Sequence, residues 1–340
     1  MSAPAGAAPS RLGREIAEIP EAAARLAAAP AQAALRAEAA ALRDLAPPAL
    51  LTAARGSSDH AATALKYAVE LTLGLPVASV GPSVASVYGA ALRVPGMAAF
   101  ALSQSGASAD LAVLARTLRA GGARVVVLSN RPESPLAREA HAVIDVLAGP
   151  EEAVAATKSF VSTLVAGLWL VAHWSGDEAL RRALGGLPDA LAAALEADAA
   201  PLDALLASPR RLTVLGRGPQ LGLALEAGLK IREVLARPAD GYSAAEALHG
   251  PATLIDEGAG LVAFGDRADT GVAEALERLV GQGAAVVRLA RLLPEPAGAH
   301  PLTVGLGQIA LLYAAVERAA RAAGLDPDRP RFLRKETVTR

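Results

Sequence analysis

Residues 97–118 read MAAFALSQSGASADLAVLARTL, and this stretch decides the fold class. It begins with an apolar run at 97–102, continues through a polar loop at 103–108 and ends in a segment with the Leu and Ala spacing of a helix. A run that is apolar at every position, instead of at alternate positions, is typical of a strand buried on both faces of a parallel sheet. The stretch therefore predicts a strand, a loop and a helix in succession.

The same rhythm recurs along the chain, with helical stretches between the apolar runs. The other runs are 50–54, 76–80, 124–129, 142–147, 211–216, 260–265 and 285–290. This alternation predicts an α/β protein with parallel sheets covered by helices on both faces, in the flavodoxin-like doubly wound topology. The pair Arg55-Gly56 after one run is matched by Arg217-Gly218 after a later one, and so long a period indicates two tandem domains rather than a solenoid.

A chain of 340 residues with 53% hydrophobic content is longer than a domain with a single hydrophobic core usually is, which also favours two domains. Breaks at Gly185, Gly186, Pro188 and Pro201 interrupt the helical spacing between the two series of strands. The expected organisation is an N-terminal extension with a frayed end (1–30), a first domain (31–176), a helical connector (177–209), a second domain (210–325) and a C-terminal tail (326–340).

Charge and composition exclude several classes of function. The formal charge is −1, from 33 basic and 34 acidic residues, so no global field directs the protein to nucleic acid or to a membrane surface. The sequence contains no cysteine, which excludes disulfides, thiolate nucleophiles and cysteine-ligated zinc. The patterns HExxH, GxGxxG and GxxxxGK[ST] are also absent, so we expect neither a metal nor a nucleotide cofactor.

Two observations bear on location. The first 26 residues contain no sustained apolar run and carry Glu15, Glu18 and Glu21, which argues against a signal peptide and favours the cytoplasm. The uncharged stretch 159–176 is long enough to span a membrane, but it contains His173 and four hydroxyl residues, Ser159, Ser162, Thr163 and Ser175. We expect it to be a buried helix of a protein that lies outside the membrane.

The loop at 103–108 could bind a phosphate. Ser103, Gln104, Ser105 and Ser108 surround a glycine just before the predicted helix. A phosphate there would meet unpaired amides of the helix N-terminus, the positive end of the helix dipole and several hydroxyl donors. The alternative is structural, with Ser105 or Ser108 serving only as a helix cap.

A second polar turn, RGSSDH, follows the strand predicted at 50–54. It places Gly56, Ser57 and Ser58 before another helix. Because ligands of open α/β sheets bind at the carboxyl ends of the strands, we expect both loops to converge on one ligand. Here too the serines could instead be helix caps.

The segment 220–238 reads as one helix, closed by Pro238, that carries a charged stripe. Glu226, Lys230 and Glu233 are spaced i, i+4 and i+7, so they share one face among apolar neighbours. On its own this pattern is typical of solvent-exposed ion pairs. Sixteen residues after Glu233, His249 lies in the turn-forming sequence HGP, and no other histidine has such a polar, turn-forming context.

With these residues in view, the chain resembles the SIS (sugar isomerase) domain family. It is most similar to the isomerase half of glucosamine-6-phosphate synthase and to stand-alone aminosugar-phosphate deaminases and isomerases. The strings that carry the resemblance, in chain order, are GSSDHA, SQSGASAD, EEAVAATKSF, LGRGPQLGLALEAGLKIREV, AEALHGPATLID and RFLRKETVTR.

The resemblance implies a role for each motif. The implied phosphate contacts are Ser58, Ser103, Gln104, Ser105 and Ser108. Glu233 would move a proton between C1 and C2 of the sugar, His249 would assist ring opening, and Lys335 would form a Schiff base with the open-chain carbonyl. The supporting positions would be Gly56, Ser57, Ala155, Thr157, Lys158, Glu226 and Lys230. Residue types agree with this chemistry, since isomerisation needs one base and an imine acidifies the adjacent C–H. Position alone would instead make Lys335 part of a solvated tail.

The resemblance also implies an aminosugar 6-phosphate as substrate, no cofactor, and a homodimer in which His249 serves the neighbouring subunit's site. The synthase carries a glutaminase domain with a cysteine nucleophile, and this sequence contains neither. We therefore expect ammonia release from glucosamine 6-phosphate to fructose 6-phosphate. Ala107 replaces the glutamate of the SQSGE form, and Arg340 stands where the synthase typically has glutamate. Two alternatives remain open: a deglycase that splits a fructosamine phosphate, and a non-catalytic sugar-phosphate sensor.

Overall fold

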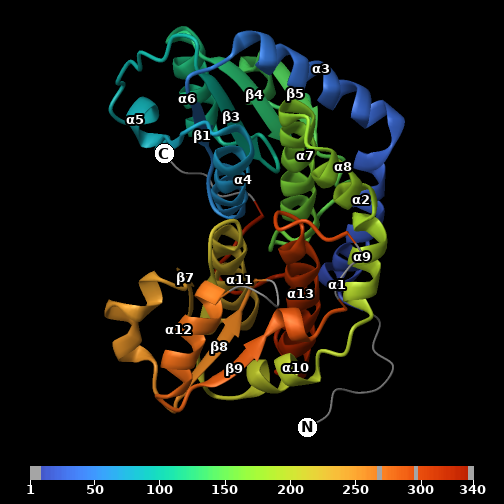
Figure 1. The fold of residues 1–340 in the computed structure, drawn as a ribbon, viewed down its shortest axis with the longest axis vertical. Coiled ribbons are helices and arrows are strands. Elements are labelled where there is room, and N and C mark those ends of the chain that lie inside the picture. The colour runs from blue at the N-terminus through green and yellow to red at the C-terminus, as the bar shows by residue number, and fades with distance from the viewer. Residues whose placement is uncertain (1–8, 266–269, 295–297, 336–340) are drawn as a thin grey trace. The chain divides into compact units, whose positions relative to one another are not determined.

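The computed structural model describes residues 9–265, 270–294 and 298–335. This part of the chain divides into two compact units. The first, called the N-sheet unit, comprises residues 21–150 and 158–185. The second, called the C-sheet unit, comprises residues up to 20, residues 151–157 and residues 186–335. Figure 1 labels the elements of both units.

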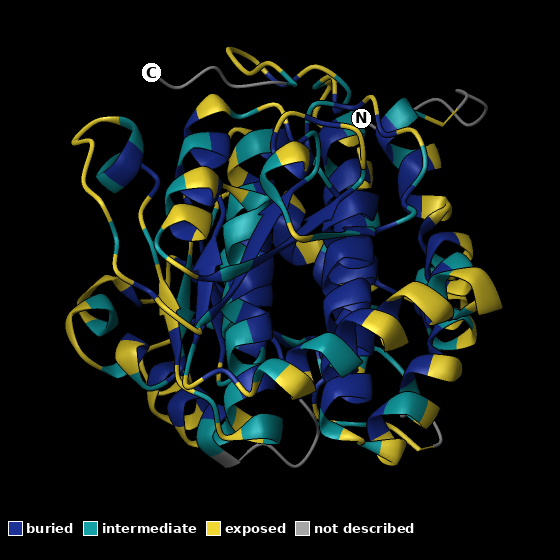
Figure 2. Cartoon of the chain, turned by 90° about the horizontal axis from the view of Figure 1, so that it is seen from above, coloured by how far each residue is buried: buried dark blue, intermediate teal, exposed yellow. Residues whose placement is uncertain are grey.

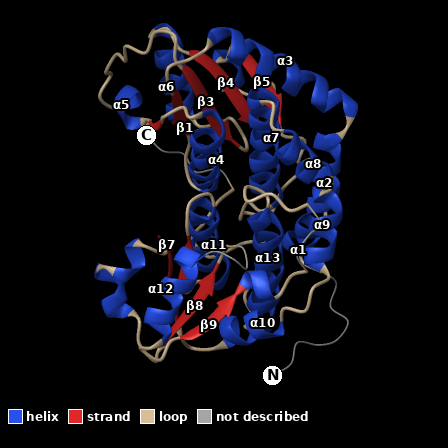
Figure 3. Cartoon of the chain, viewed as in Figure 1, coloured by secondary structure: helices blue, strands red, loops and turns tan. Residues whose placement is uncertain are grey.

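The N-sheet unit contains a five-stranded sheet in which all strands are parallel. In spatial order the strands are β2 (Val77–Ser79), β1 (Leu50–Ala53), β3 (Ala98–Ser103), β4 (Arg124–Ser129) and β5 (Ala142–Asp145). The order 2-1-3-4-5 is the flavodoxin-like one, so the predicted fold class is confirmed. Figure 3 shows these strands in red, bracketed by blue helices.

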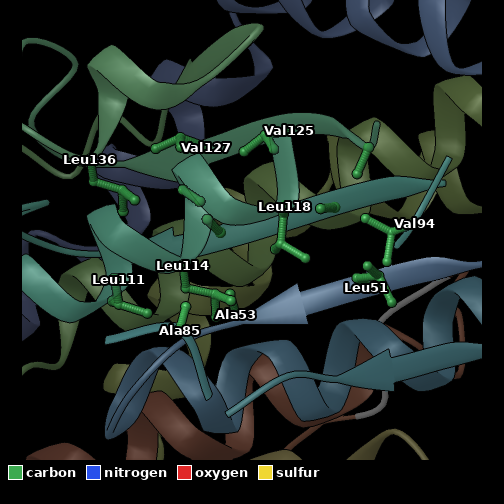
Figure 4. Packing of buried hydrophobic residues seen from close by; sticks show 14 residues of the cluster. Leu51, Ala53, Ala85, Val94, Leu111, Leu114, Leu118, Val125, Val127 and Leu136 are labelled. Atoms are coloured by element: carbon green, nitrogen blue, oxygen red, sulfur yellow. The ribbon is translucent and has the colours of Figure 1, made fainter. Parts of the chain in front are cut away.

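One face of this sheet packs against α6 (Ala109–Ala120). Alternate strand residues such as Leu51, Val125 and Val127 form a buried cluster with Leu114 and Leu118 of α6 (Figure 4). This alternation follows from the strand geometry, because successive side chains point to opposite faces. The residues between them therefore face the other helical layer.

The second layer of the N-sheet unit centres on α7 (Lys158–Ser175), which packs against α3 and α4. Every residue from 158 to 174 is buried, as expected for an apolar helix enclosed by protein. Phe100 of β3 contacts Trp174 of α7, with ring centroids 6.5 Å apart. Among the described residues, no helix is long and apolar enough to cross a membrane. The remaining helices of this unit are α3 (Ala29–Leu45), α4 (Ser57–Leu73), α5 (Ser83–Ser86) and α8 (Glu178–Gly185).

The C-sheet unit contains a four-stranded parallel sheet. In spatial order the strands are β7 (Ala239–Ser243), β6 (Arg211–Gly216), β8 (Ala259–Ala263) and β9 (Ala285–Arg288). Sequence analysis missed β7, because ADGYS is a polar edge strand without an apolar run. Gly241 is required there, since a Cβ at this position would lie 2.5 Å from the carbonyl oxygen of Ala224.

Helices cover both faces of the second sheet as well. α11 (Gln220–Leu235) packs on β6 and β7 and against α13 (Val304–Ala322), while α12 (Thr270–Val280) closes the cluster on the opposite face. The predicted stripe-bearing helix is thus confirmed, and it ends at Leu235, three residues before Pro238. In Figure 2 the central strands and inner helices are mostly dark blue, as buried, and yellow exposed residues lie along outer helices and loops.

The predicted connector and extension both contain regular helices. Residues 177–209 hold α8, α9 (Leu187–Leu195) and α10 (Ala200–Ala207), which end or begin at the predicted glycine and proline breaks. Residues 11–27 form α1 (Arg11–Ala17) and α2 (Ile19–Ala27), and Ser10 caps α1 by accepting the N–H of Gly13. The predicted frayed end falls largely on residues 1–8, which lie outside the described residues.

Candidate active site

The loop between β3 and α6 in the N-sheet unit is held by its own serines. Ser103 Oγ accepts the N–H of Gly106 at 3.0 Å, and Ser105 Oγ accepts the N–H of Ala107 at 3.2 Å. Gly106 has φ +61°, and a Cβ there would lie 2.0 Å from Ser134 Oγ, so only glycine fits. Ser108 precedes α6 but makes no side-chain capping bond, so the cap interpretation is wrong for this residue.

The loop after β1 begins α4 without a serine cap. The N-cap is Gly56, with φ +53° and no side chain to bond, and Ser57 and Ser58 are the first two helical residues. The cap interpretation is therefore wrong for this loop too. Because β1 and β3 are paired parallel neighbours, both loops lie at the same edge of the sheet. Arg55 and Asp110 form an ion pair that joins them.

The charged stripe on α11 is buried, not solvent-exposed. The side chains of Glu226 and Lys230 are 0% and 1% exposed, whereas that of Glu233 is 22% exposed. Lys230 Nζ lies 3.4 Å from Glu226 Oε1 and forms a shorter ion pair with Glu233. The interpretation as surface ion pairs is wrong, because α13 packs over this face of α11. Glu233 is the one member of the stripe that a ligand could reach.

Burial and charge act in opposite directions on Lys230. Burial lowers the pKa of Lys230, but the carboxylates of Glu226, Glu233 and Glu151 raise it, and the net effect is a raised pKa. Lys230 therefore stays an ammonium at neutral pH and cannot act as a nucleophile. Within the stripe, its positive charge stabilises the carboxylates that it pairs with.

Tyr313 of α13 completes the buried end of the stripe. Its hydroxyl donates to Glu226 Oε1 at 3.3 Å, and its ring is 1% exposed. Burial first, and then the charge of Glu226, raise the pKa of Tyr313 well above its usual value. Tyr313 therefore remains a hydrogen-bond donor at all physiological pH values.

Lys335 is bound to the C-sheet unit and is not part of a solvated tail. Its Nζ donates to the carbonyl of Ala153 at 2.6 Å and lies 3.3 Å from Glu151 Oε2. The Glu151 side chain is fully buried and accepts the N–H of Thr157 at 3.0 Å. The Lys335 side chain is 25% exposed, so its amine can be reached by a small molecule.

Glu151 links the two sets of charges. Its carboxylate raises the pKa of both Lys230 and Tyr313, and it pairs with Lys335. We call Glu151, Glu226, Lys230, Glu233, Tyr313 and Lys335 the carboxylate–lysine cluster. Sequence analysis missed Glu151 and Tyr313; Glu151 lies in the quoted string EEAVAATKSF, but nothing in the sequence marks Tyr313.

Of the other predicted positions, Thr157 contacts this cluster, because its backbone N–H donates to Glu151 at 3.0 Å. His249 is exposed and lies between two 3₁₀ helices, Glu246–Leu248 and Gly250–Leu254. Ala155 and Thr157 are buried, and the hydroxyl of Thr157 has no hydrogen-bond partner in the described part of the chain. Lys158 is buried at the start of α7 in the N-sheet unit, where its Nζ donates to Pro150 O at 2.8 Å.

The described residues contain no group of three or more His, Asp or Glu side chains that could hold a metal ion. The carboxylate–lysine cluster supplies ionisable side chains at different depths. It offers the partly exposed carboxylate of Glu233, paired with buried Lys230, and the partly exposed side chain of Lys335, paired with buried Glu151.

Replacing Lys230 by Met should strongly destabilise the protein. The change leaves the buried carboxylate of Glu226 without its cation, and breaking a buried ion pair costs about 3–5 kcal/mol. Because the pKa of Lys230 is raised above 10.5, its pairing contributes fully below about pH 10 and is lost only as the pH rises further. Urea unfolding at pH 7.5 measures the change.

Lys66→Met is the matched control for this prediction. Lys66 also pairs with a carboxylate four residues away, Glu70, but both side chains are partly exposed, so its loss should change stability by less than about 1 kcal/mol. The double variant Glu226→Gln/Lys230→Met should regain much of the loss, because no charge is left buried. Equal effects of Lys230→Met and Lys66→Met would contradict the buried-charge argument.

The fold and the two groups of residues can be compared with known proteins. The family model described as SIS domain matches residues 47–173. The glutamine–fructose-6-phosphate aminotransferase (isomerizing) of Symbiobacterium thermophilum is 34% identical over 313 residues, which cover 83% of this chain and 50% of that protein. The Sulfolobus acidocaldarius enzyme of the same name is 36% identical over 256 residues, or 71% and 42%. The chain thus spans about half the length of the curated relatives it matches.

Solved structures match over the whole chain. A crystal structure from Silicibacter pomeroyi DSS-3, provisionally described as a phosphosugar isomerase, is 43% identical, covers 94% of this chain and 100% of its own, and has a TM-score of 0.87. The glucosamine-6-phosphate deaminase of Thermotoga maritima is 20% identical, covers 97% and 100%, and has a TM-score of 0.76. At that identity the second likeness is one of fold.

Proposed function

Because the chain belongs to the SIS domain family, we propose that it is a phosphosugar isomerase of the SIS type, acting on an aminosugar 6-phosphate. The finer proposal is an aminosugar-phosphate deaminase/isomerase that converts glucosamine 6-phosphate, or a close analogue, and water into fructose 6-phosphate and ammonia. The observation that carries the proposal is the carboxylate–lysine cluster. It presents Glu233 and the Lys335 amine while its other charges stay buried.

The N-sheet unit would bind the phosphate. At one edge of its sheet, Ser58 lies in the first turn of α4, and the loop before α6 holds Ser103, Gln104, Ser105 and Ser108. The N-terminal amides of these helices and the serine hydroxyls supply hydrogen-bond donors for an anion. The capping bonds that would have occupied Ser57 and Ser108 are not formed, which supports this role.

The C-sheet unit would carry out the proton transfer. After ring opening, assisted in this proposal by His249, C1 of the substrate is an aldehyde and C2 bears the amine. Glu233 takes the proton from C2 and returns it to C1 as the C1 carbonyl becomes a hydroxyl, which leaves an imine at C2. The ammonium of Lys230 forms an ion pair with Glu233 and so fixes the position of this carboxylate.

Lys335 would release the ammonia. Its amine attacks C2 of the imine and displaces ammonia, so that the sugar is joined to the enzyme as a lysine imine. Water then adds to C2, the C–N bond to Lys335 breaks, and the ketone of fructose 6-phosphate forms. In the reverse direction ammonia would first displace Lys335 from C2, and Glu233 would then remove the C1–H next to the resulting imine.

The direct test is incubation with glucosamine 6-phosphate, with ammonia and fructose 6-phosphate measured by coupled assays. We expect both products in a 1:1 ratio, because each turnover releases one ammonia and one ketose. Galactosamine 6-phosphate and N-acetylated analogues extend the panel to other stereochemistry and substitution. Absence of turnover with every aminosugar phosphate would refute the proposal.

A deglycase is the second candidate, because the same lysine imine can release a larger amine from C1-substituted fructosamine phosphates. Ala107 favours keeping it in the panel, since the loop before α6 is smaller here than in the SQSGE form. Release of an amino acid from a fructosamine 6-phosphate, faster than ammonia from glucosamine 6-phosphate, would select this function. Binding of sugar phosphates without any turnover would indicate a sensor.

A further inference from the structure

Helix α1 ties together segments of the C-sheet unit that are far apart in sequence. At its start, the amides of Arg11 and Leu12 donate to the carboxylate of Asp328 at 3.0 and 2.8 Å. The hydroxyl of Ser10 donates to Glu317 of α13 at 2.6 Å. Helix α1 is therefore fixed to α13 and to the segment that leads to Lys335.

The other end of α1 holds the turn that binds Lys335. Glu15 is 5% exposed, and its Oε1 accepts the backbone N–H groups of both Glu152 and Ala153. The carbonyl of Ala153 accepts from Lys335 Nζ at 2.6 Å, and Glu151 of the same turn pairs with Lys335. Glu15 thus contacts Ala153 itself and the residue next to Glu151, and these are the two residues that hold the amine.

The burial of Glu15 has an energetic cost. The described residues place no arginine or lysine within ion-pair distance of this carboxylate, which has the two backbone N–H groups as its partners. Burial raises the pKa of Glu15 in spite of these hydrogen bonds. Burial of this carboxylate therefore costs stability at neutral pH. What Glu15 contributes is the geometry that its hydrogen bonds impose on residues 151–153.

We propose that Glu15 is a positioning residue for Lys335: it fixes the 151–153 turn, and the turn aims the amine. Two consequences follow. Loss of the acceptor at position 15 frees the Lys335 side chain while the fold persists. Gln at position 15, whose carbonyl oxygen can still accept both N–H groups, keeps the amine in place. The expected loss of activity rests on the proposed function, whereas the expected release of the Lys335 side chain does not.

The chain contains four lysines, which provide a direct measurement with internal controls. Lys66 has a side chain that is 43% exposed, whereas Lys158 and Lys230 are buried in different units. Reductive methylation with formaldehyde and borane, followed by peptide mass spectrometry, gives the labelling rate of Lys335 relative to Lys66. Labelling of Lys158 or Lys230 would report a general loss of structure.

In Glu15→Ala we expect the Lys335-to-Lys66 labelling ratio to rise several-fold, with Lys158 and Lys230 still protected. Glu15→Gln should keep the wild-type ratio. Glu21→Ala is the matched control, because Glu21 is an exposed glutamate of the next helix that pairs with partly exposed Arg25. An unchanged ratio in Glu15→Ala, or a rise that Gln does not prevent, would overturn the proposal.

Kinetics separate positioning from simple destabilisation. Glu15→Ala should lower kcat for glucosamine 6-phosphate by about 10- to 10²-fold with little change in KM, because the amine is misplaced while the phosphate loops are untouched. Glu15→Gln should restore kcat. If labelling responds as expected but the wild-type protein turns over no aminosugar phosphate, the proposed function fails and the positioning role stands.

Discussion

Replacing Glu233 by Gln should lower kcat for glucosamine 6-phosphate by about 10²- to 10⁴-fold, the usual contribution of a general base. The amide cannot accept the C2 proton, yet it has nearly the same shape as the carboxylate. Since Glu233 is the partly exposed end of the stripe, the fold should persist. Steady-state kinetics with the ammonia assay measure the effect, and exchange of solvent deuterium into the product at C1 reports the proton transfer itself.

Glu274→Gln is the matched control for this variant. Glu274 pairs with Arg278 on α12 of the same unit, also within one helix, but both side chains are exposed. Its kcat should be within about twofold of wild type, as expected for a surface substitution. Retained turnover in Glu233→Gln would remove this residue from the mechanism and leave the buried stripe a structural role.

Replacing Lys335 by Arg should abolish turnover, with a loss on the order of 10³-fold or more, because a guanidinium cannot form an imine. Arg can still pair with Glu151, so the charge of the site is kept. In the wild-type protein, fructose 6-phosphate with cyanoborohydride should yield a stable adduct on Lys335, identified by peptide mass spectrometry. The Arg variant should form none.

Lys66→Arg provides the control. Among the lysines with described ion pairs, Lys66 has the most exposed side chain, and it lies in the N-sheet unit. It should keep full activity and still trap the adduct at Lys335. An adduct found only at Lys66, or substantial activity in Lys335→Arg, would show that the reaction proceeds without a lysine imine at position 335. Proton transfer by Glu233 alone would then be the better account.

Much of the fold follows from local patterns that need no tertiary information. Continuous apolar runs such as 98–103 and 124–129 are buried on both faces, so their composition alone indicates central parallel strands. The edge strand β7 lacks that signal, because half of its residues face solvent or the backbone of α11. Its place in the sheet depends on packing with β6 and α11, which no local pattern records.

For the candidate site, too, the sequence predicted one part and the tertiary structure decided another. The loops before α4 and α6 were predicted as ligand loops, and their positions at one sheet edge follow from parallel topology. Their serines also suited helix caps, and the observed hydrogen bonds, not the residue types, exclude that role for Ser57 and Ser108. Roles in binding remain predictions for the assays above.

The sequence by itself determined the parallel α/β architecture, the stripe on α11 and the likeness to the SIS family, because periodicity and contiguous motifs are local properties. Only the tertiary structure decided that the stripe is buried, that Glu151 and Tyr313 join it and that Glu15 holds the turn beneath Lys335. Burial depends on what packs over a face, and residues 15, 151 and 335 meet only when the chain folds. Contacts between such distant residues follow from the packing of elements, which short-range patterns do not encode.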